Sequence, residues 1–140
     1  MLIEMSVARL AVDPFTNTPI VVLKDGAGKN AVPIWIGLLE ASAIAMEIEK
    51  VELARPMTHD LMKTMLAKTG VEVARVEVSD LRDNTYYATI CLRHGGREIA
   101  IDARPSDALA LALRTGARIC VDEAIVEKAR HVDLRGRTEA

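Results

Sequence analysis

The N-terminal segment alternates apolar and polar residues with the period of two that is typical of a β-strand. Apolar side chains stand at Ile3, Met5 and Val7, and the phase then changes, because the next ones are Leu10 and Val12. A strand whose apolar side chains switch from one face to the other in mid-run indicates a β-bulge at the point of the switch.

Two shorter strands and two helices are expected next. Residues 19–24 and 32–36 are rich in Val and Ile and are bounded by Pro, Asn and Gly, which favours strands. Residues 38–53 carry apolar side chains at helical spacing with charged residues largely opposite, which predicts an amphipathic helix. A proline breaks this helix, and a second one is expected from Thr58, as its N-cap, to Gly70.

The same order of elements then returns. Val73-Ala74-Arg75-Val76 resembles Val7-Ala8-Arg9-Leu10 and sits in a strand with the same phase change. A strand over residues 86–93, a tight loop at residues 94–96 and an apolar stretch at residues 99–101 complete the second set. Hairpin-length loops leave no room for crossover helices, so the strands should be antiparallel. The pattern predicts an α+β fold of two similar β3α2-like halves, with a mainly antiparallel, curved sheet and packed helices.

Residues 105–115 favour a third helix, because Ala and Leu dominate and Pro105 suits the first helical turn. This helix is apolar nearly all round, so it is either central in the fold or in contact with a second copy; we expect a homodimer. A short strand over residues 117–121 and a helix capped by Asp122 should complete one domain over residues 1–130. Residues 131–140 are polar, and we expect a flexible tail.

Composition limits the class of protein. The chain has 140 residues, of which 50% are hydrophobic and 27% charged, so an intrinsically disordered protein is excluded. The formal net charge of −2 argues against a protein that coats DNA, but it allows nucleic acid as a transient substrate. No apolar run is long enough to span a membrane, and the N-terminus has no signal-peptide pattern, so we expect a cytoplasmic protein without a membrane partner. The two cysteines, Cys91 and Cys120, are expected to be buried thiols.

Polar residues are concentrated where helices begin. Residues 55–60 and residues 102–107 share one plan, Arg-Pro followed by a hydroxyl and an Asp, and Glu40 falls in the first turn of the first helix. The structural explanation is that these residues are caps and ion pairs. The functional explanation is that helix N-termini and arginines bind phosphate, while carboxylates and a histidine hold a divalent cation, position water or move a proton.

Three motifs resemble the bifunctional nuclease family, also named for its BFN domain. They are Pro33-Ile34-Trp35-Ile36-Gly37-x-x-Glu40-Ala41, Arg55-Pro56-x-Thr58-His59-Asp60-Leu61 and Asp102-Ala103-Arg104-Pro105-Ser106-Asp107-Ala108. The resemblance covers about residues 1–130 and implies a compact α+β domain with the ability, in some members, to degrade DNA and RNA. It points to these motifs as the location of the site.

The chemistry of each side chain then suggests its role. The candidate catalytic residues are His59, Asp60, Asp102 and Asp107. The candidate phosphate-binding residues are Arg55, Arg104 and Ser106. Glu40, Asp102 and Asp107 are candidate metal ligands, with a divalent cation such as Mg²⁺ as the candidate cofactor. We expect the two Arg-Pro helix starts to face each other across the domain.

Three functions remain open at this point. The first is a nuclease that hydrolyses phosphodiester bonds of DNA or RNA, with or without a metal. The second is a non-catalytic dimeric ligand-binding or regulatory domain in which the motifs are caps and ion pairs. The third is an enzyme acting on a different small molecule. The net charge favours the second, and the His and Arg residues that capping does not require favour the first.

Overall fold

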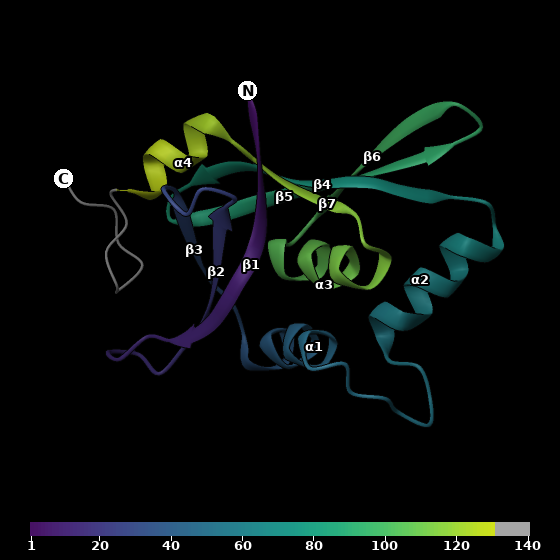
Figure 1. Cartoon of the computed structure of the whole chain (residues 1–140), viewed down its shortest axis with the longest axis horizontal. Helices are drawn as coiled ribbons and strands as arrows, with labels where there is room; N and C mark the ends of the chain where they lie inside the picture. The colour runs from purple at the N-terminus through teal and green to yellow at the C-terminus, as the bar shows by residue number, and fades with distance from the viewer. Residues whose placement is uncertain (131–140) are drawn as a thin grey trace.

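The computed structural model describes residues 1–130 as an α+β domain, with one sheet of seven strands and four helices among these residues (Figure 1). In chain order the elements are β1 (Leu2–Val12), β2 (Pro19–Asp25), β3 (Ala31–Trp35), α1 (Leu38–Ile48), α2 (Thr58–Lys68), β4 (Glu72–Arg82), β5 (Thr85–His94), β6 (Arg97–Ala103), α3 (Pro105–Thr115), β7 (Arg118–Asp122) and α4 (Glu123–Ala129). The predicted tail at residues 131–140 lies outside the described residues.

The sheet has the strand order β3-β2-β1-β7-β4-β5-β6. Its neighbours are antiparallel, as predicted, except that β4 and β7 run parallel. Local turn chemistry explains the hairpins: Asp83 and Asn84 connect β4 to β5, Gly95 and Gly96 connect β5 to β6, and all four have positive φ. The late strand β7 inserts between β1 and β4 and so joins β1–β3 and β4–β6 into one sheet.

Both predicted bulges are present. The register of β1 against β2 shifts between Val7 and Arg9, and that of β4 against β5 shifts between Val73 and Arg75. The prediction of a curved sheet needs correction, because the sheet does not curl on itself. Pairing between the two strands resumes directly after each bulge. The sheet therefore stays open, with β3 and β6 as its two edge strands. The structure does not show an internal duplication, which stays a hypothesis from the sequence.

Two helix boundaries differ from the prediction. Helix α1 ends at Ile48, short of the predicted end at residue 53, because Lys50 adopts the left-handed conformation with φ of 53°. The N-cap of α2 is Met57, while Thr58 is the first helical residue. The carboxylate of Asp60 supplies the capping interaction in place of a Thr58 hydroxyl, since it accepts a hydrogen bond from the Met57 backbone N–H at 3.0 Å.

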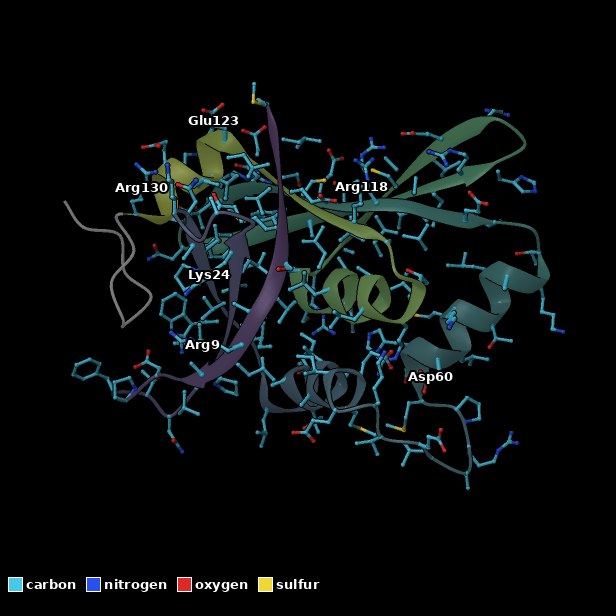
Figure 2. All side chains as sticks on the ribbon, viewed as in Figure 1. Arg9, Lys24, Asp60, Arg118, Glu123 and Arg130 are labelled. Carbon is cyan, nitrogen blue, oxygen red and sulfur yellow. The ribbon has the colours of Figure 1, made fainter. Side chains whose placement is uncertain are left out.

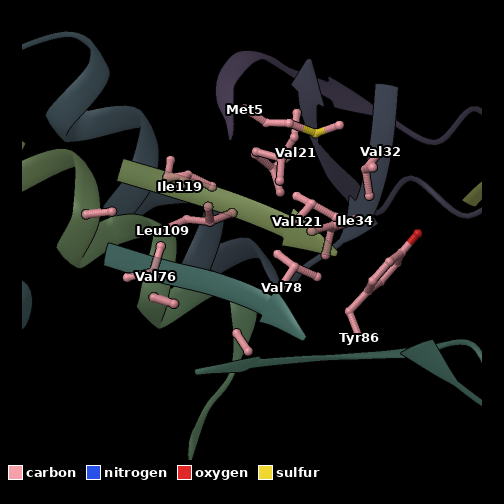
Figure 3. Close-up of a cluster of buried hydrophobic side chains, with 14 of the residues drawn as sticks. Met5, Val21, Val32, Ile34, Val76, Val78, Tyr86, Leu109, Ile119 and Val121 are labelled. Carbon is pink, nitrogen blue, oxygen red and sulfur yellow. The ribbon is translucent and has the colours of Figure 1, made fainter. Parts of the chain in front are cut away.

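Helix α3 is the centre of the core, which explains why it is apolar nearly all round. It packs on β4, β5 and β7, and α1 and α2 pack against it (Figure 1). Leu109 lies among Val76, Ile119 and Val121 of the sheet in the buried cluster of Figure 3. Because α3 is covered within one chain, it no longer argues for a dimer, and self-association remains a prediction.

Both cysteines are buried and free, as predicted. Burial raises the pKa of the Cys91 thiol to about 11, and its hydrogen bond to Glu77 acts in the same direction. A thiol in that state is a poor nucleophile. Within residues 1–130, none of the helices is long and apolar enough to cross a membrane.

Candidate active site between the helix starts

The first turns of α2 and α3 bring a histidine and an aspartate together. His59 follows the first residue of α2, and Asp107 lies in the first turn of α3. The Nε2–H of His59 donates to Oδ1 of Asp107 at 3.0 Å. The other carboxylate oxygen, Oδ2, accepts a hydrogen bond from Nε of Arg104 at 3.0 Å. One carboxylate therefore holds a histidine from one helix and an arginine from the cap of another.

The electrostatics keep Asp107 ionised. Burial acts to raise the pKa of this carboxyl, but the hydrogen bonds from His59 and Arg104 outweigh burial and lower the pKa below its ordinary value. The carboxylate therefore stays negative at neutral pH and can orient the imidazole. An Asp in this position also stabilises the imidazolium that forms when the histidine takes a proton.

Glu40 extends this array to α1. Nη1 of Arg104 donates to Oε1 of Glu40 at 3.5 Å. The Glu40 carboxylate folds back over the start of α1, where a Cβ on Gly37 would lie 2.6 Å from its Oε2. Only glycine leaves room for this position. Arg104 itself keeps 65% of its side chain exposed, so its guanidinium still faces solvent.

A buried arginine that sequence reasoning missed holds the three helices in place. Arg114, in the last turn of α3, is 7% exposed. Its Nε donates to Oδ1 of Asp60 at 2.8 Å, and its two Nη groups donate to the carbonyl oxygens of Ala110 and Ala43, each at 2.9 Å. The available signal was the one basic residue of a helix that is apolar over most of its length.

Asp60 has a positioning task in this arrangement. Both of its oxygens are engaged, one with Arg114 and one with the Met57 backbone N–H. The Met57 hydrogen bond lowers the pKa of Asp60 most, burial opposes that effect, and Arg114 lowers the pKa further. Figure 2 shows Asp60 at the end of α2 that faces α1 and α3. Asp60 thereby fixes the start of α2, and with it the neighbouring His59.

A pocket of about 450 Å³ opens at this array. Its polar lining includes Glu40, His59, Arg104, Asp107 and Arg114. The rest of the lining is largely apolar and comes from Leu39, Ala43, Met46 and Met57. A cavity with an apolar wall and a few converging polar groups is the usual form of a binding or active site.

The structure does not bring every predicted residue to this pocket. Arg55 lies exposed in the loop between α1 and α2, and its side chain forms no ion pair within residues 1–130. Asp102 is exposed on β6, opposite Thr89. Its neighbour Ile101 faces α2 and α3, and adjacent strand residues point to opposite faces, so Asp102 points away from the helices. Ser106 is buried and lines a second cavity.

The predicted metal ligands are therefore not assembled. Glu40 and Asp107 are both bonded to Arg104, which is a cation in the place where a metal ion would have to bridge them. In the part of the chain that the structure describes, no three His, Cys, Asp or Glu side chains are grouped closely enough to hold one ion. The three predicted ligands Glu40, Asp102 and Asp107 thus form no common Mg²⁺ site, because Arg104 stands between two of them and Asp102 lies on the other face of β6.

Comparison with known proteins places the chain among nuclease-like sequences. The sequence model of the bifunctional nuclease domain matches residues 21–133. An uncharacterized protein of Mycobacterium tuberculosis is 40% identical over 126 residues, which is 90% of this chain and 75% of the relative. Bifunctional nuclease 1 of Arabidopsis thaliana is 32% identical over 110 residues, which is 75% of this chain and 34% of the relative. Bifunctional nuclease 2 of Oryza sativa subsp. japonica is 29% identical over 111 residues. The chain spans about a third of the length of these plant relatives.

Proposed function

Because the chain belongs to the bifunctional nuclease domain family, we propose that it is a nuclease that hydrolyses phosphodiester bonds of DNA or RNA. The observation that carries the proposal is the hydrogen-bonded array of His59, Asp107 and Arg104 at the mouth of an open pocket. A proton acceptor and a phosphate-binding cation held side by side are what phosphodiester cleavage needs.

His59 is the candidate general base. Its Nε2–H is committed to Asp107, so the lone pair of Nδ1 is left to accept a proton, and Nδ1 has no partner within residues 1–130. In the proposed reaction a water oxygen attacks phosphorus while Nδ1 takes the proton of that water. The bond from phosphorus to the leaving sugar oxygen then breaks, and this oxygen takes the proton back from the imidazolium.

Arg104 is the candidate phosphate-binding residue. Asp107 and Glu40 engage its Nε and Nη1, which orients the guanidinium while Nη2 stays without a partner among the described residues. Charge accumulates on the nonbridging phosphate oxygens during the attack, and a fixed guanidinium stabilises that charge. Asp102 and Arg55 have no role in this proposal, and Asp60 and Arg114 act by positioning α2.

A non-catalytic ligand-binding or regulatory domain remains the second candidate. The specific observation in its favour is that the charged groups pair with one another: Arg104 with Glu40 and Asp107, and Arg114 with Asp60. Ion pairs of this kind also occur in pure scaffolds. A domain of this class would bind its ligand without cleaving nucleic acid.

A nuclease assay separates the two candidates. Purified chain is incubated with end-labelled single-stranded RNA and DNA, with and without EDTA, and compared with His59→Ala and Asp107→Asn. We expect each variant to lose about 10²-fold or more in cleavage rate, the usual size of a general acid–base contribution. His94→Ala is the matched control, because His94 is exposed at the end of β5. Equal cleavage by all four proteins, or none by the wild type, would reject the proposed mechanism.

The EDTA arm has its own expected result. Since Arg104 stands between the carboxylates of Glu40 and Asp107 and supplies the cation of the proposed step, we expect cleavage to persist when divalent cations are chelated. Circular dichroism melting of each variant shows whether lost cleavage reflects lost chemistry or lost folding. A variant that melts like the wild type but no longer cleaves supports a catalytic role.

A further inference from the structure

A second cavity adjoins the Arg104–Glu40 ion pair. Its volume is about 530 Å³, and Glu40 and Arg104 line both this cavity and the pocket that holds His59. The two cavities therefore adjoin at a cation that is the candidate phosphate site. A ligand with a phosphate at Arg104 has room to extend in the direction away from His59.

The lining of this second cavity combines aromatic rings with hydroxyl groups. Trp35 and Tyr86 supply the rings, and the hydroxyl-bearing residues are Thr16, Thr18, Thr85 and Ser106. Aromatic side chains stack on nucleobases with little regard to base identity. Hydroxyls are suitable partners for the sugar and for polar edges of a base. The lining thus has the chemistry of a nucleoside site.

Trp35 is held in a fixed orientation before any ligand binds. Its Nε1–H donates to Oδ2 of Asp13 at 2.9 Å, and Oδ1 of the same carboxylate accepts from the Phe15 backbone N–H at 2.8 Å. Asp13 is completely buried, so this anchor is shielded from water. A ring that is already fixed loses little conformational entropy on binding, which favours affinity.

Tyr86 gives an independent indication of a ligand. The residue is 9% exposed, and its hydroxyl is buried without a hydrogen-bond partner among the described residues. Buried hydroxyls are nearly always paired, because an unpaired one has lost its water without compensation. Tyr86 lines the second cavity, but its hydroxyl has almost no surface open to it, so an acceptor on a bound molecule would reach this hydroxyl through a small shift of the ring.

We propose that the second cavity binds the base and sugar of a nucleotide whose phosphate contacts Arg104. This inference rests on the proposed function and extends it, since it makes the cavity the nucleoside subsite next to the scissile phosphate. The first turn of α3 supports the phosphate end, because it begins directly after Arg104 and presents backbone N–H groups there.

Trp35 provides a direct readout, because it is the chain's one tryptophan. Its fluorescence is recorded while the full chain is titrated with adenosine 5′-monophosphate, adenosine 3′-monophosphate, adenosine, ribose 5-phosphate and inorganic phosphate. We expect saturable quenching by at least one mononucleotide, with an affinity at least tenfold higher than that of inorganic phosphate. A short oligonucleotide ending in the same nucleotide shows whether the site takes a free nucleotide or a strand end.

Two variants at neighbouring positions test the site itself. Tyr86→Phe removes the unpaired hydroxyl, and we expect it to weaken mononucleotide binding at least fivefold. Tyr87→Phe is the matched control: Tyr87 is next along β5, and its ring packs under the guanidinium of Arg82 at 4.1 Å. We expect the control to bind like the wild type. Arg104→Gln should weaken the mononucleotide but leave adenosine binding unchanged, since adenosine has no phosphate.

The outcomes separate this inference from the proposed function. Unchanged Trp35 fluorescence in a chain that cleaves nucleic acid would overturn the nucleoside site and leave the nuclease standing. Nucleotide binding that is lost in Tyr86→Phe, in a chain that does not cleave, would support the site and reject the nuclease. Equal affinity for phosphate and mononucleotide, or equal binding by both tyrosine variants, would overturn the inference.

Discussion

Replacing Arg114 with methionine removes the cation at the junction of α1, α2 and α3 while keeping most of the side-chain volume. The guanidinium forms one ion pair with Asp60 and two hydrogen bonds to the carbonyls of Ala43 and Ala110. All of these contacts are lost in the variant. Because His59 lies in the first turn of the helix that Asp60 anchors, the substitution also loosens the candidate site.

The expected loss of stability depends on whether each group that loses Arg114 as a partner finds another one. Breaking a fully buried ion pair costs about 3–5 kcal/mol. Here Asp60 keeps 40% of its side chain exposed, so water can replace part of the lost interaction. Both carbonyls also accept the regular hydrogen bonds of their own helices, so neither is left unpaired. We therefore expect Arg114→Met to lower the free energy of unfolding by about 2–3 kcal/mol, the cost of charged hydrogen bonds.

Urea unfolding followed by circular dichroism measures this difference. Arg97→Met is the control, because Arg97 is exposed on β6 and its removal should change stability by no more than about 0.5 kcal/mol. The double variant Arg114→Met with Asp60→Asn should be less destabilised than the sum of the two single variants, since they remove the same contact. A cost for Arg114→Met as small as that of the control would refute the reasoning.

Three further predictions use other parts of the molecule. The pKa of Asp107 is lowered in the folded chain. Its stabilising contribution is therefore present above its unfolded pKa of about 3.9 and is lost as the pH falls through the folded value. The free energy of unfolding of Asp107→Asn, measured with urea from pH 7 to pH 2, should fall less steeply than that of the wild type. Gly37→Ala should displace the Glu40 carboxylate and lower the cleavage rate with little change in melting temperature, whereas Gly26→Ala, where an added Cβ meets nothing within 4 Å, should cleave normally. Ile101 on the edge strand β6 is 43% exposed, and we expect two copies of the chain to pair along this edge. Sedimentation at micromolar concentration should show a dimer that Ile101→Lys converts to a monomer. A wild-type monomer would contradict this expectation.

Features that depend on neighbouring residues could be predicted from the sequence. The two bulges follow from the change of phase in β1 and β4, since side chains must alternate along a strand. The hairpins follow from turn residues that tolerate positive φ, and α3 begins at Pro105 and is followed by Gly116, as helix signals indicate. The three motifs also located the helix starts to within one residue, because the signals that begin a helix are local.

Features that depend on contacts between distant residues were decided by the tertiary structure. The insertion of β7 between β1 and β4 depends on the way α3 packs across the sheet, and no local pattern encodes it. Burial of Arg114 against Asp60 is known only once α2 and α3 lie side by side. The motif predicts Asp102 at the site. Its apolar neighbour Ile101 lies on the face of β6 toward the helices, so Asp102 lies on the opposite face. Periodicity determines which side chains share a face, but which faces meet is a property of the packed chain as a whole.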